Sequence, residues 1–410
     1  MKTACRILEA VGPALTGLGV LFKAPTNLLE LRKLNCGLFY GTSQIGKFLT
    51  VYPVDSNQAL ELASLLDQLT RRIPGPKVPF ERPYRRGSRV FYRYGSFDSL
   101  ETTVDSVRVP ALRAPNGELV PDIRDDPDFE PPWASNPFPP TKNRGSKKSA
   151  FRTRYLVYEA VTQRGKGGVY RALCMDAAPM MRCVIKEGRR NGETDWDGTD
   201  GRRRVLAESE ILGELAKGGV SAPEVFDIFT EGGNLYLALE DVGRMDLEHL
   251  IRESPATVEE SLLYAAKVAG LVSGIHECGL AWRDCKPRNV VVGESMQFYA
   301  IDFEGACRID AKDALPWGSE TYLAPEWSDP AANLEKVDLF ALGVTCYQIL
   351  AGGRTLGMTL EEIKRVPLGR RRRHIPPDAR RLVASLLDHD PKHRPSAFDA
   401  AALLDQLATA

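Results

Sequence analysis

Three side chains able to do chemistry stand close together in the segment 282–289, which reads Trp-Arg-Asp-Cys-Lys-Pro-Arg-Asn. One tight loop can present Asp284, Lys286 and Asn289 together, and Asp302 follows a short predicted strand. Asp284 is suited to accept the proton of an attacking hydroxyl, while Lys286 steadies a transferring phosphate. Asn289 and Asp302 carry oxygen ligands that can hold Mg²⁺ against nucleotide phosphates. The spacing therefore suits a phosphoryl-transfer site that holds Mg²⁺ and a nucleotide.

The sequence from residue 155 onward indicates which helices and strands must position this loop. In chain order, they are strands at 155–161, 168–172 and 182–187, a mobile charged loop at 188–201 and a helix at 204–216. Most of the chain after Leu247 is predicted to be helical. Strands first and helices second indicate an α+β fold.

The loop and its surroundings resemble the catalytic loop and metal-binding motif of eukaryotic-type protein kinases. By that resemblance, Asp284 is the catalytic base, Lys286 is the phosphate-steadying lysine, and Asn289 and Asp302 are the two Mg²⁺ ligands. Lys186, in Val-Ile-Lys, resembles the strand lysine that contacts the α and β phosphates of ATP. The resemblance implies a two-lobed kinase fold of about 260 residues.

Other positions also match the kinase pattern, some of them more closely than others. Glu208 resembles the helix carboxylate that orients Lys186, and Glu210 is its rival. The ATP-binding set is completed by partial matches to the glycine-rich loop, namely Gly165, Gly167, Gly168 and Val169, and by Glu240 and Val242 in the hinge. A plain hairpin turn would explain these glycines equally well. Three matches have structural roles in the family: Glu326, Asp338 and Arg394.

Two positions depart from the kinase pattern. Trp282 replaces the usual His before Arg-Asp, and Glu304 replaces the usual Gly after Asp-Phe. Both changes alter packing and flexibility around Asp302, but neither removes a metal ligand or the base. A degenerate kinase normally loses one of four residues, all of which are present, so an active kinase is expected. The four are Lys186, Asp284, Asn289 and Asp302.

An ordered set of motifs before residue 141 carries a second resemblance. It comprises 22–25 (Phe-Lys-Ala-Pro), 43–53, 90–95, 123–125 (Ile-Arg-Asp), 132–133 (Pro-Trp) and 136–138 (Asn-Pro-Phe). The set is similar to the front of class III lanthipeptide synthetases, in which a phosphothreonine-lyase-like domain precedes a kinase. The resemblance implies that the kinase phosphorylates Ser and Thr of a precursor peptide and that the lyase then eliminates phosphate. The family's C-terminal cyclase has no counterpart here, so a separate cyclase is an expected partner.

Elimination of phosphate explains the residue types in this front region. Lys23 matches the family's lysine that removes the Cα proton, and it must be neutral to act, so burial or nearby cations must lower its pKa. Lys47 and Arg93 would hold the phosphate. The family's His that protonates the leaving phosphate is missing, since no His precedes His249. Three explanations stay open: translation starts upstream of Met1, the chain is shortened, or the domain only binds a phosphopeptide.

The amino-acid composition and net charge limit the kinds of partner that the chain can be expected to have. The 54 basic residues balance the 54 acidic ones, so net charge gives no reason to expect a nucleic-acid partner. A hydrophobic fraction of 43% without a membrane-length apolar run predicts a protein without a membrane partner. The eight scattered Cys are expected to be reduced thiols in a cytoplasm. The basic run 370–373 is interpreted as a solvated loop, with docking of an acidic peptide as the alternative.

Together these patterns predict a lyase-like N-terminal domain at 1–141, truncated at its start, a linker at 142–150 and a kinase domain at 151–410. Within the first domain, residues 1–73 are predicted to form a helix, a strand, a strand at 45–52 and a helix at 56–69, and a further strand is predicted at 90–94. The leading hypothesis is an ATP- and Mg²⁺-dependent Ser/Thr kinase that acts on a peptide in lanthipeptide-type dehydration. One rival is a stand-alone regulatory kinase. The other is a non-catalytic scaffold that binds nucleotide and peptide.

Overall fold

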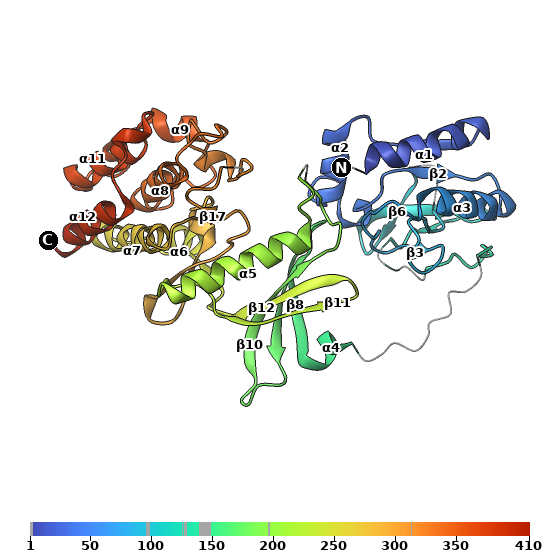
Figure 1. The fold of residues 1–410 in the computed structure, drawn as a ribbon, viewed down its shortest axis with the longest axis horizontal. Helices are drawn as coiled ribbons and strands as arrows, with labels where there is room; N and C mark the ends of the chain where they lie inside the picture. Colours follow the sequence, from blue (N-terminus) through green and yellow to red (C-terminus); the bar gives the residue numbers. More distant parts are fainter. Residues whose placement is uncertain are drawn as a thin grey trace. The chain divides into compact units, whose positions relative to one another are not determined.

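The computed structural model describes residues 3–95, 99–124, 126, 129–138, 149–195, 197–312 and 314–410. The chain divides into two compact units (Figure 1). One consists of Met1–Met181, Ile185–Val205 and Phe229–Tyr236, and the other of Arg182–Val184, Leu206–Ile228 and Leu237–Ala410. Helices and sheets occur in both, so the predicted mixed α+β class is confirmed.

The N-terminal region is built on two helices and a two-stranded sheet. These elements are α1 (Ala4–Gly17), β1 (Leu21–Lys23), β2 (Thr50–Tyr52) and α3 (Ser56–Thr70). The strands are antiparallel, with Lys23 opposite Thr50. Val11 and Leu15 of α1 meet Leu62 of α3 in a buried apolar cluster. The predicted order of helix, strand, strand and helix is present, although the strand predicted at 45–52 is formed only at Thr50–Tyr52.

A further helix, α2 (Leu28–Cys36), lies between the two strands and was not predicted. The side chain of Asn27 caps its N-terminus by accepting a hydrogen bond from the Glu30 amide at 2.9 Å. Its C-terminus stops at Gly37, whose φ of 76° is the left-handed conformation that glycine adopts at low cost. A short 3₁₀ turn follows at η1 (Thr42–Gln44).

The described residues between 74 and 138 include five short strands in two small antiparallel sheets. Their strands are β3 (Arg82–Pro83), β4 (Phe91–Tyr92), β5 (Glu101–Val104), β6 (Val107–Arg113) and β7 (Leu119–Pro121). β3 pairs with β4, and β5, β6 and β7 form a three-stranded sheet. Asp67 of α3 fastens this region, because it accepts hydrogen bonds from Arg85 and Ser88 at 2.7 Å each.

The next region contains a five-stranded sheet in the order β11-β12-β10-β9-β8. Its elements are α4 (Ala150–Arg154), β8 (Tyr155–Gln163), β9 (Gly168–Cys174), β10 (Met181–Gly188), α5 (Gly201–Lys217), β11 (Val225–Glu231) and β12 (Asn234–Glu240). The predicted strands lie within β8, β9 and β10, and the predicted helix lies within α5. The first seven residues of the predicted linker, 142–148, lie outside the described residues. Ser149 caps α4.

The chain after β12 is mainly helical, as predicted. Its helices are α6 (Leu247–Glu253), α7 (Val258–Glu277), α8 (Leu334–Leu350), α9 (Leu360–Arg365), α10 (Leu368–Arg371), α11 (Pro377–Leu386) and α12 (Ala397–Thr409). Figure 1 shows α7, α8, α11 and α12 gathered together, with α8 packed against α7 and α11. Because α8 is buried along almost its whole length, it gives the catalytic loop a rigid support.

Short strands and 3₁₀ turns carry the loops around this helical core. They are β13 (Met245–Asp246), β14 (Leu280–Ala281), η2 (Pro287–Asn289), β15 (Val290–Val292), η3 (Glu294–Met296), β16 (Phe298–Ala300), β17 (Cys307–Arg308), η4 (Glu320–Tyr322) and η5 (Pro391–His393). The strand predicted at 298–301 is β16. Within the described parts of the chain, every helix is too short or too polar to span a lipid bilayer.

Candidate active site

One buried carboxylate from α8 holds the start of the catalytic loop. The backbone amides of Trp282 and Arg283 donate to the two oxygens of Asp338, each at 2.6 Å. The ring Nε2 of His276 lies 3.1 Å from the same carboxylate. Asp338 is fully buried, so its charge is compensated by these groups rather than by water. This is the geometry expected of a brace for the loop.

The predicted base and lysine lie in contact on this loop. Lys286 Nζ donates to Asp284 Oδ2 at 2.6 Å, and Asn289 Nδ2 donates to the same oxygen at 2.8 Å. The hydroxyl of Ser319 donates to Asp284 Oδ1 at 2.8 Å and accepts from Lys286 Nζ at 2.7 Å. Asp284 therefore keeps one orientation in a ring of donors, as a positioned general base requires.

The two predicted metal ligands come from neighbouring segments. Ile301 N–H donates to the carbonyl of Asn289 at 2.9 Å, which places the chain leading into Asp302 beside the catalytic loop. The side-chain amide of Asn289 uses its Nδ2 on Asp284, so its Oδ1 is the atom left to meet a cation. Asp302 has φ of 62°, a left-handed conformation that costs energy in a non-glycine residue and is common at functional sites. An amide oxygen and a carboxylate are the hard ligands that suit Mg²⁺.

The unusual Trp282 has a defined structural place. Its indole Nε1 donates to the carbonyl of Ile301 at 3.2 Å, and its ring stacks on Phe303 with centroids 5.9 Å apart. Trp282 and Phe303 are both buried. The substitution of Trp for His therefore keeps a hydrogen bond and a packed ring next to Asp302.

Glu208 faces the same segment. Its Oε1 accepts a hydrogen bond from the backbone amide of Phe303 at 3.1 Å, and its side chain is buried on α5. The rival Glu210 is exposed to solvent. Lys186 lies on β10, directly after the buried Ile185. Of the two glutamates, only Glu208 is thus placed to act inside the fold.

The hinge and glycine-loop residues lie at the ends of strands. Glu240 ends β12, and its amide donates to the carbonyl of Glu224 at 2.9 Å, whereas Val242 follows in the connection to β13. Gly168 and Val169 begin β9. Gly165 and Gly167 form a tight turn between β8 and β9, closed by two backbone hydrogen bonds between Arg164 and Gly167 at 2.8 and 3.2 Å.

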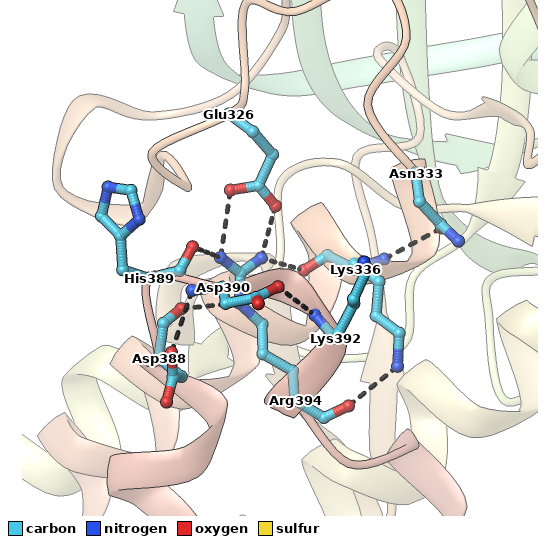
Figure 2. Close-up of polar contacts among 8 residues, drawn as sticks. All are labelled: Glu326, Asn333, Lys336, Asp388, His389, Asp390, Lys392 and Arg394. Carbon is cyan, nitrogen blue, oxygen red and sulfur yellow. Dashed lines mark hydrogen bonds and ion pairs between the residues drawn. The ribbon is translucent and has the colours of Figure 1, made fainter.

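The predicted structural pair is formed (Figure 2). Both terminal nitrogens of Arg394 donate to the carboxylate of Glu326, the second at 3.0 Å. The guanidinium also donates to the carbonyls of Lys336, Asp388 and His389. Since Arg394 is almost completely buried, the pair joins the end of the activation segment, 302–326, to the helical core.

The three cations predicted in the N-terminal region, Lys23, Lys47 and Arg93, line one cavity of about 1030 Å³. Lys47 is paired with Glu81 at 2.6 Å, and Arg93 is paired with the buried Asp122. Lys23 is exposed, with its Nζ 5.7 Å from the centre of the Tyr52 ring. The burial of Lys23 that was considered from sequence is therefore not found.

Burial changes the acidity of two groups next to the catalytic loop. It raises the pKa of the Cys285 thiol well above its ordinary value, so this neighbour of Asp284 stays a neutral thiol. Burial likewise raises the pKa of Tyr322, whose hydroxyl donates to Gln348 at 2.7 Å. Neither group is therefore ionised at neutral pH.

Comparison with known families agrees with this geometry. The model of the protein kinase domain matches residues 158–404, well over half of the chain. The chain belongs to the protein kinase family. A second model, that of the RamC N-terminal domain, matches residues 1–150 of this kinase. The predicted resemblance, a synthetase-type N-terminal domain followed by a protein kinase domain, is thereby confirmed.

Individual relatives support both parts. The protein named "Probable SapB synthase" from Streptomyces coelicolor is 28% identical over 321 residues, which are 74% of this chain and 33% of that protein. An Aurora kinase from Schizosaccharomyces pombe is 30% identical over 202 residues, 47% of this chain and 56% of that protein. A Ser/Thr protein kinase, PkaA of Streptomyces coelicolor, is 26% identical over 273 residues, 61% of this chain and 49% of that protein. The kinase thus spans about a third of the synthase and about half of each of these two kinases.

Several residues at the site were missed from sequence. Ser319 lies 35 positions after Asp284 and meets it only in the folded chain. Its one sequence signal is its place shortly before Ala-Pro-Glu at 324–326. Glu81 and Asp122 were missed because no local pattern links them to Lys47 and Arg93.

Proposed function

We propose that this chain is an ATP- and Mg²⁺-dependent Ser/Thr kinase. The observation that carries the proposal is the ring of hydrogen bonds formed by Asp284, Lys286, Asn289 and Ser319. Its members come from the catalytic loop and from the activation segment, so both segments are ordered together. The kinase family match supports the use of ATP.

Each side chain has a role that follows from its contacts. Asp284, with both oxygens held by donors, accepts the proton of the attacking hydroxyl. Lys286 lies against Asp284 and supplies the positive charge beside the transferring phosphate. Asn289 and Asp302 are the Mg²⁺ ligands, and the bound ion would neutralise charge on the phosphate oxygens. Lys186 and Glu208 are proposed as the lysine–carboxylate pair of the ATP site.

We infer that the substrate is a peptide modified in lanthipeptide-type dehydration. The RamC-type N-terminal domain and the similarity to a SapB synthase support this inference. Phosphate placed on Ser or Thr would then be an intermediate, and a second site on the same chain would meet it at high effective concentration.

The cavity of the N-terminal region is the proposed site for the phosphorylated residue. Lys47 and Arg93 supply cations with only 17% and 23% of their side chains exposed, and each is held by a carboxylate until an anion competes for it. Lys23 is the proposed base for the Cα proton. The first 248 residues of the sequence contain no His, and no residue is assigned here as the proton donor for the leaving phosphate.

Mass spectrometry tests the proposal directly. The full chain is incubated with ATP, Mg²⁺ and the peptide encoded beside its gene. Phosphorylation adds about 80 Da per site, and elimination leaves each site about 18 Da below the starting mass. Phosphorylation of general substrates, unaffected by deletion of residues 1–141, would instead support a regulatory kinase. Absence of any mass change with the true partner would support a scaffold.

A further inference from the structure

The glycine-rich turn between β8 and β9, residues 164–167, is held from two sides in this structure. On one side stands Arg189, which follows β10. Its backbone amide donates to the carbonyl of Lys166 at 2.7 Å, and its Nη1 donates to the carbonyl of Arg164 at 3.1 Å. One residue thus binds two of the four carbonyls of the turn.

Arg189 is itself fixed by the residue that follows the predicted ATP lysine. Its Nε donates to Glu187 Oε2 at 3.2 Å, and the Glu187 side chain is only 8% exposed. Glu187 also accepts hydrogen bonds from Tyr170 of β9 at 3.1 Å and from Asn234 of β12 at 2.7 Å. Burial, followed by the charge of Glu187, raises the pKa of Tyr170 to about 12, so this hydroxyl stays a donor. The clamp is therefore anchored on three strands of one sheet.

The other side of the turn is the N-terminal domain. The amide of Gly165 donates to the carbonyl of Cys36, the last residue of α2, at 3.2 Å. A Cβ atom on Gly165 would overlap the carbonyl oxygen of Asn35, so only glycine permits this approach. Asn191, in the loop after Arg189, donates to the carbonyl of Gly75 at 3.1 Å and adds a second attachment to the same domain.

The loop between β10 and α5 closes around the turn. A Cβ on Gly201 would overlap the carbonyl oxygen of Lys166, and a Cβ on Gly167 would overlap that of Glu187. The turn and the loop thus each contribute a glycine that lets the two backbones pack closely. The loop 188–201, predicted to be mobile, also has internal hydrogen bonds, such as that from the Asn191 amide to Asp200 at 2.7 Å. A turn packed this closely has few conformations to lose when a ligand binds.

We propose that Arg189 and the Cys36 carbonyl are positioning groups that hold the glycine-rich turn in one conformation, so that the N-terminal domain helps to set the affinity of the kinase for ATP. The inference rests on the proposed function, because it assumes that ATP binds under this turn. This assignment differs from the prediction from sequence, which placed Gly165 and Gly167 among the ATP-binding residues. Their amides are engaged by Cys36 and Arg164, so we assign these glycines to the clamp rather than to direct phosphate contact.

The test compares ATP affinity with peptide affinity in the full-length chain. ATP is titrated calorimetrically in the presence of Mg²⁺, and KM is measured for the peptide encoded beside the gene. Arg189→Ala and Gly165→Ala are each expected to raise the Kd for ATP about tenfold, because the turn must then be ordered by ATP itself. The peptide KM is expected to stay unchanged. Arg189→Lys keeps a cation in the side chain, which Arg189→Ala does not, and should give an intermediate Kd.

Two matched variants serve as controls. Arg190→Ala removes a neighbouring arginine whose side chain is exposed, and Gly213→Ala adds a Cβ on α5 where no atom lies within 4 Å. Both should bind ATP as the wild type does. The melting temperature of each nucleotide-free variant shows whether it folds. If Arg189→Ala does not fold, Arg189→Lys and Glu187→Gln carry the test.

The outcomes separate the two proposals. A wild type that binds no ATP contradicts the proposed function itself. A wild type that binds ATP, with the same Kd in Arg189→Ala and Gly165→Ala, overturns only the clamp. If Arg189→Ala loses ATP affinity and Gly165→Ala does not, the role proposed for the N-terminal domain is wrong. An equal rise in ATP Kd and peptide KM would indicate general damage and would also overturn the clamp.

Discussion

Replacing Arg394 with alanine should destabilise the helical part of the kinase far more than the loss of an ordinary ion pair. The guanidinium uses all five of its N–H groups: two bind Glu326, and three bind the carbonyls of Lys336, Asp388 and His389. Its side chain is 0% exposed, and it lies 5.0 Å from the centre of the Phe340 ring. Arg394→Ala would remove all of these contacts and leave the Glu326 carboxylate without its cation.

The expected loss of stability in Arg394→Ala follows from the burial of the ion pair. Breaking a buried ion pair by removing one partner costs about 3–5 kcal/mol, which for a domain of this size lowers the melting temperature by roughly 10 °C. Glu326→Gln should cost less, since Glu326 is 18% exposed and the neutral amide still accepts one hydrogen bond. Arg381→Ala is the matched control, because Arg381 pairs with Asp378 on α11 with 74% of its side chain exposed. It should cost at most about 0.5 kcal/mol.

Differential scanning calorimetry of the full chain measures the three variants. The expected order of melting temperatures for the kinase transition is Arg381→Ala above Glu326→Gln above Arg394→Ala. Arg394→Ala should also lower the kinase rate, because Glu326 ends the segment that carries Ser319. If Arg394→Ala melts within about 1 °C of Arg381→Ala, the buried pair does not anchor the activation segment and the reasoning is wrong.

Three further predictions concern the loop, the activation segment and the N-terminal region. Ser319→Ala should lower kcat about tenfold with little change in the KM for ATP, and Ser319→Thr should restore it, since Thr keeps the hydroxyl that orients Asp284. Treatment with a phosphatase should leave the kinase rate unchanged, because Arg283 is already bound to the carbonyls of Gly305 and Leu315. Residues 303–318 contain no Ser, Thr or Tyr, and the hydroxyls of Ser319, Thr321 and Tyr322 already donate hydrogen bonds within the fold. A rate that falls on treatment and recovers after incubation with ATP would contradict this. Although burial opposes it, hydrogen bonds from Arg85 and Ser88 lower the pKa of Asp67, so its contribution to stability is present at neutral pH and is lost as pH falls below about 4. The difference in unfolding free energy between Asp67→Asn and the wild type should therefore shrink in acid, and a difference independent of pH would exclude this origin.

The catalytic loop was predictable from sequence because its members are local. Asp284, Lys286 and Asn289 lie within six residues, so spacing alone brings them to one loop. Ser319 was not predictable in this way, since its contact with Asp284 depends on the path of the whole activation segment. The choice of Glu208 over Glu210 needed the fold as well, because only burial and the Phe303 amide distinguish them.

Glycines and arginines were harder to interpret from sequence than acids. Gly165 and Gly167 match a phosphate-binding pattern, but the structure shows their amides bound to other carbonyls. The basic run 370–373 was interpreted as a solvated loop. In fact, Arg372 donates to the carbonyl of Ala256 at 2.6 Å and to Ser261 at 3.0 Å, and so joins α10 to the start of α7. Such roles depend on which carbonyls lie nearby, and the sequence does not record that.

Prediction from sequence was similarly incomplete for the N-terminal region. Its helices α1 and α3 and the strand β4 were predictable from sequence, whereas α2 and the other short strands at 82–121 were not, because short strands with few buried residues carry little pattern. The cations Lys47 and Arg93 were predicted, and their carboxylate partners were not. Any phosphate bound in this cavity must therefore compete with Glu81 and Asp122.

The most direct test of the kinase proposal is the mass of the peptide encoded beside the gene after incubation with ATP, Mg²⁺ and either the wild-type chain or Asp284→Asn. We expect the wild type to add about 80 Da per phosphorylated Ser or Thr, or to leave the dehydrated product. Asp284→Asn keeps the shape of the side chain but cannot accept the proton, so it should leave the peptide mass unchanged. Equal modification by both proteins would contradict the role of Asp284, and an unmodified peptide in both would contradict the proposed kinase.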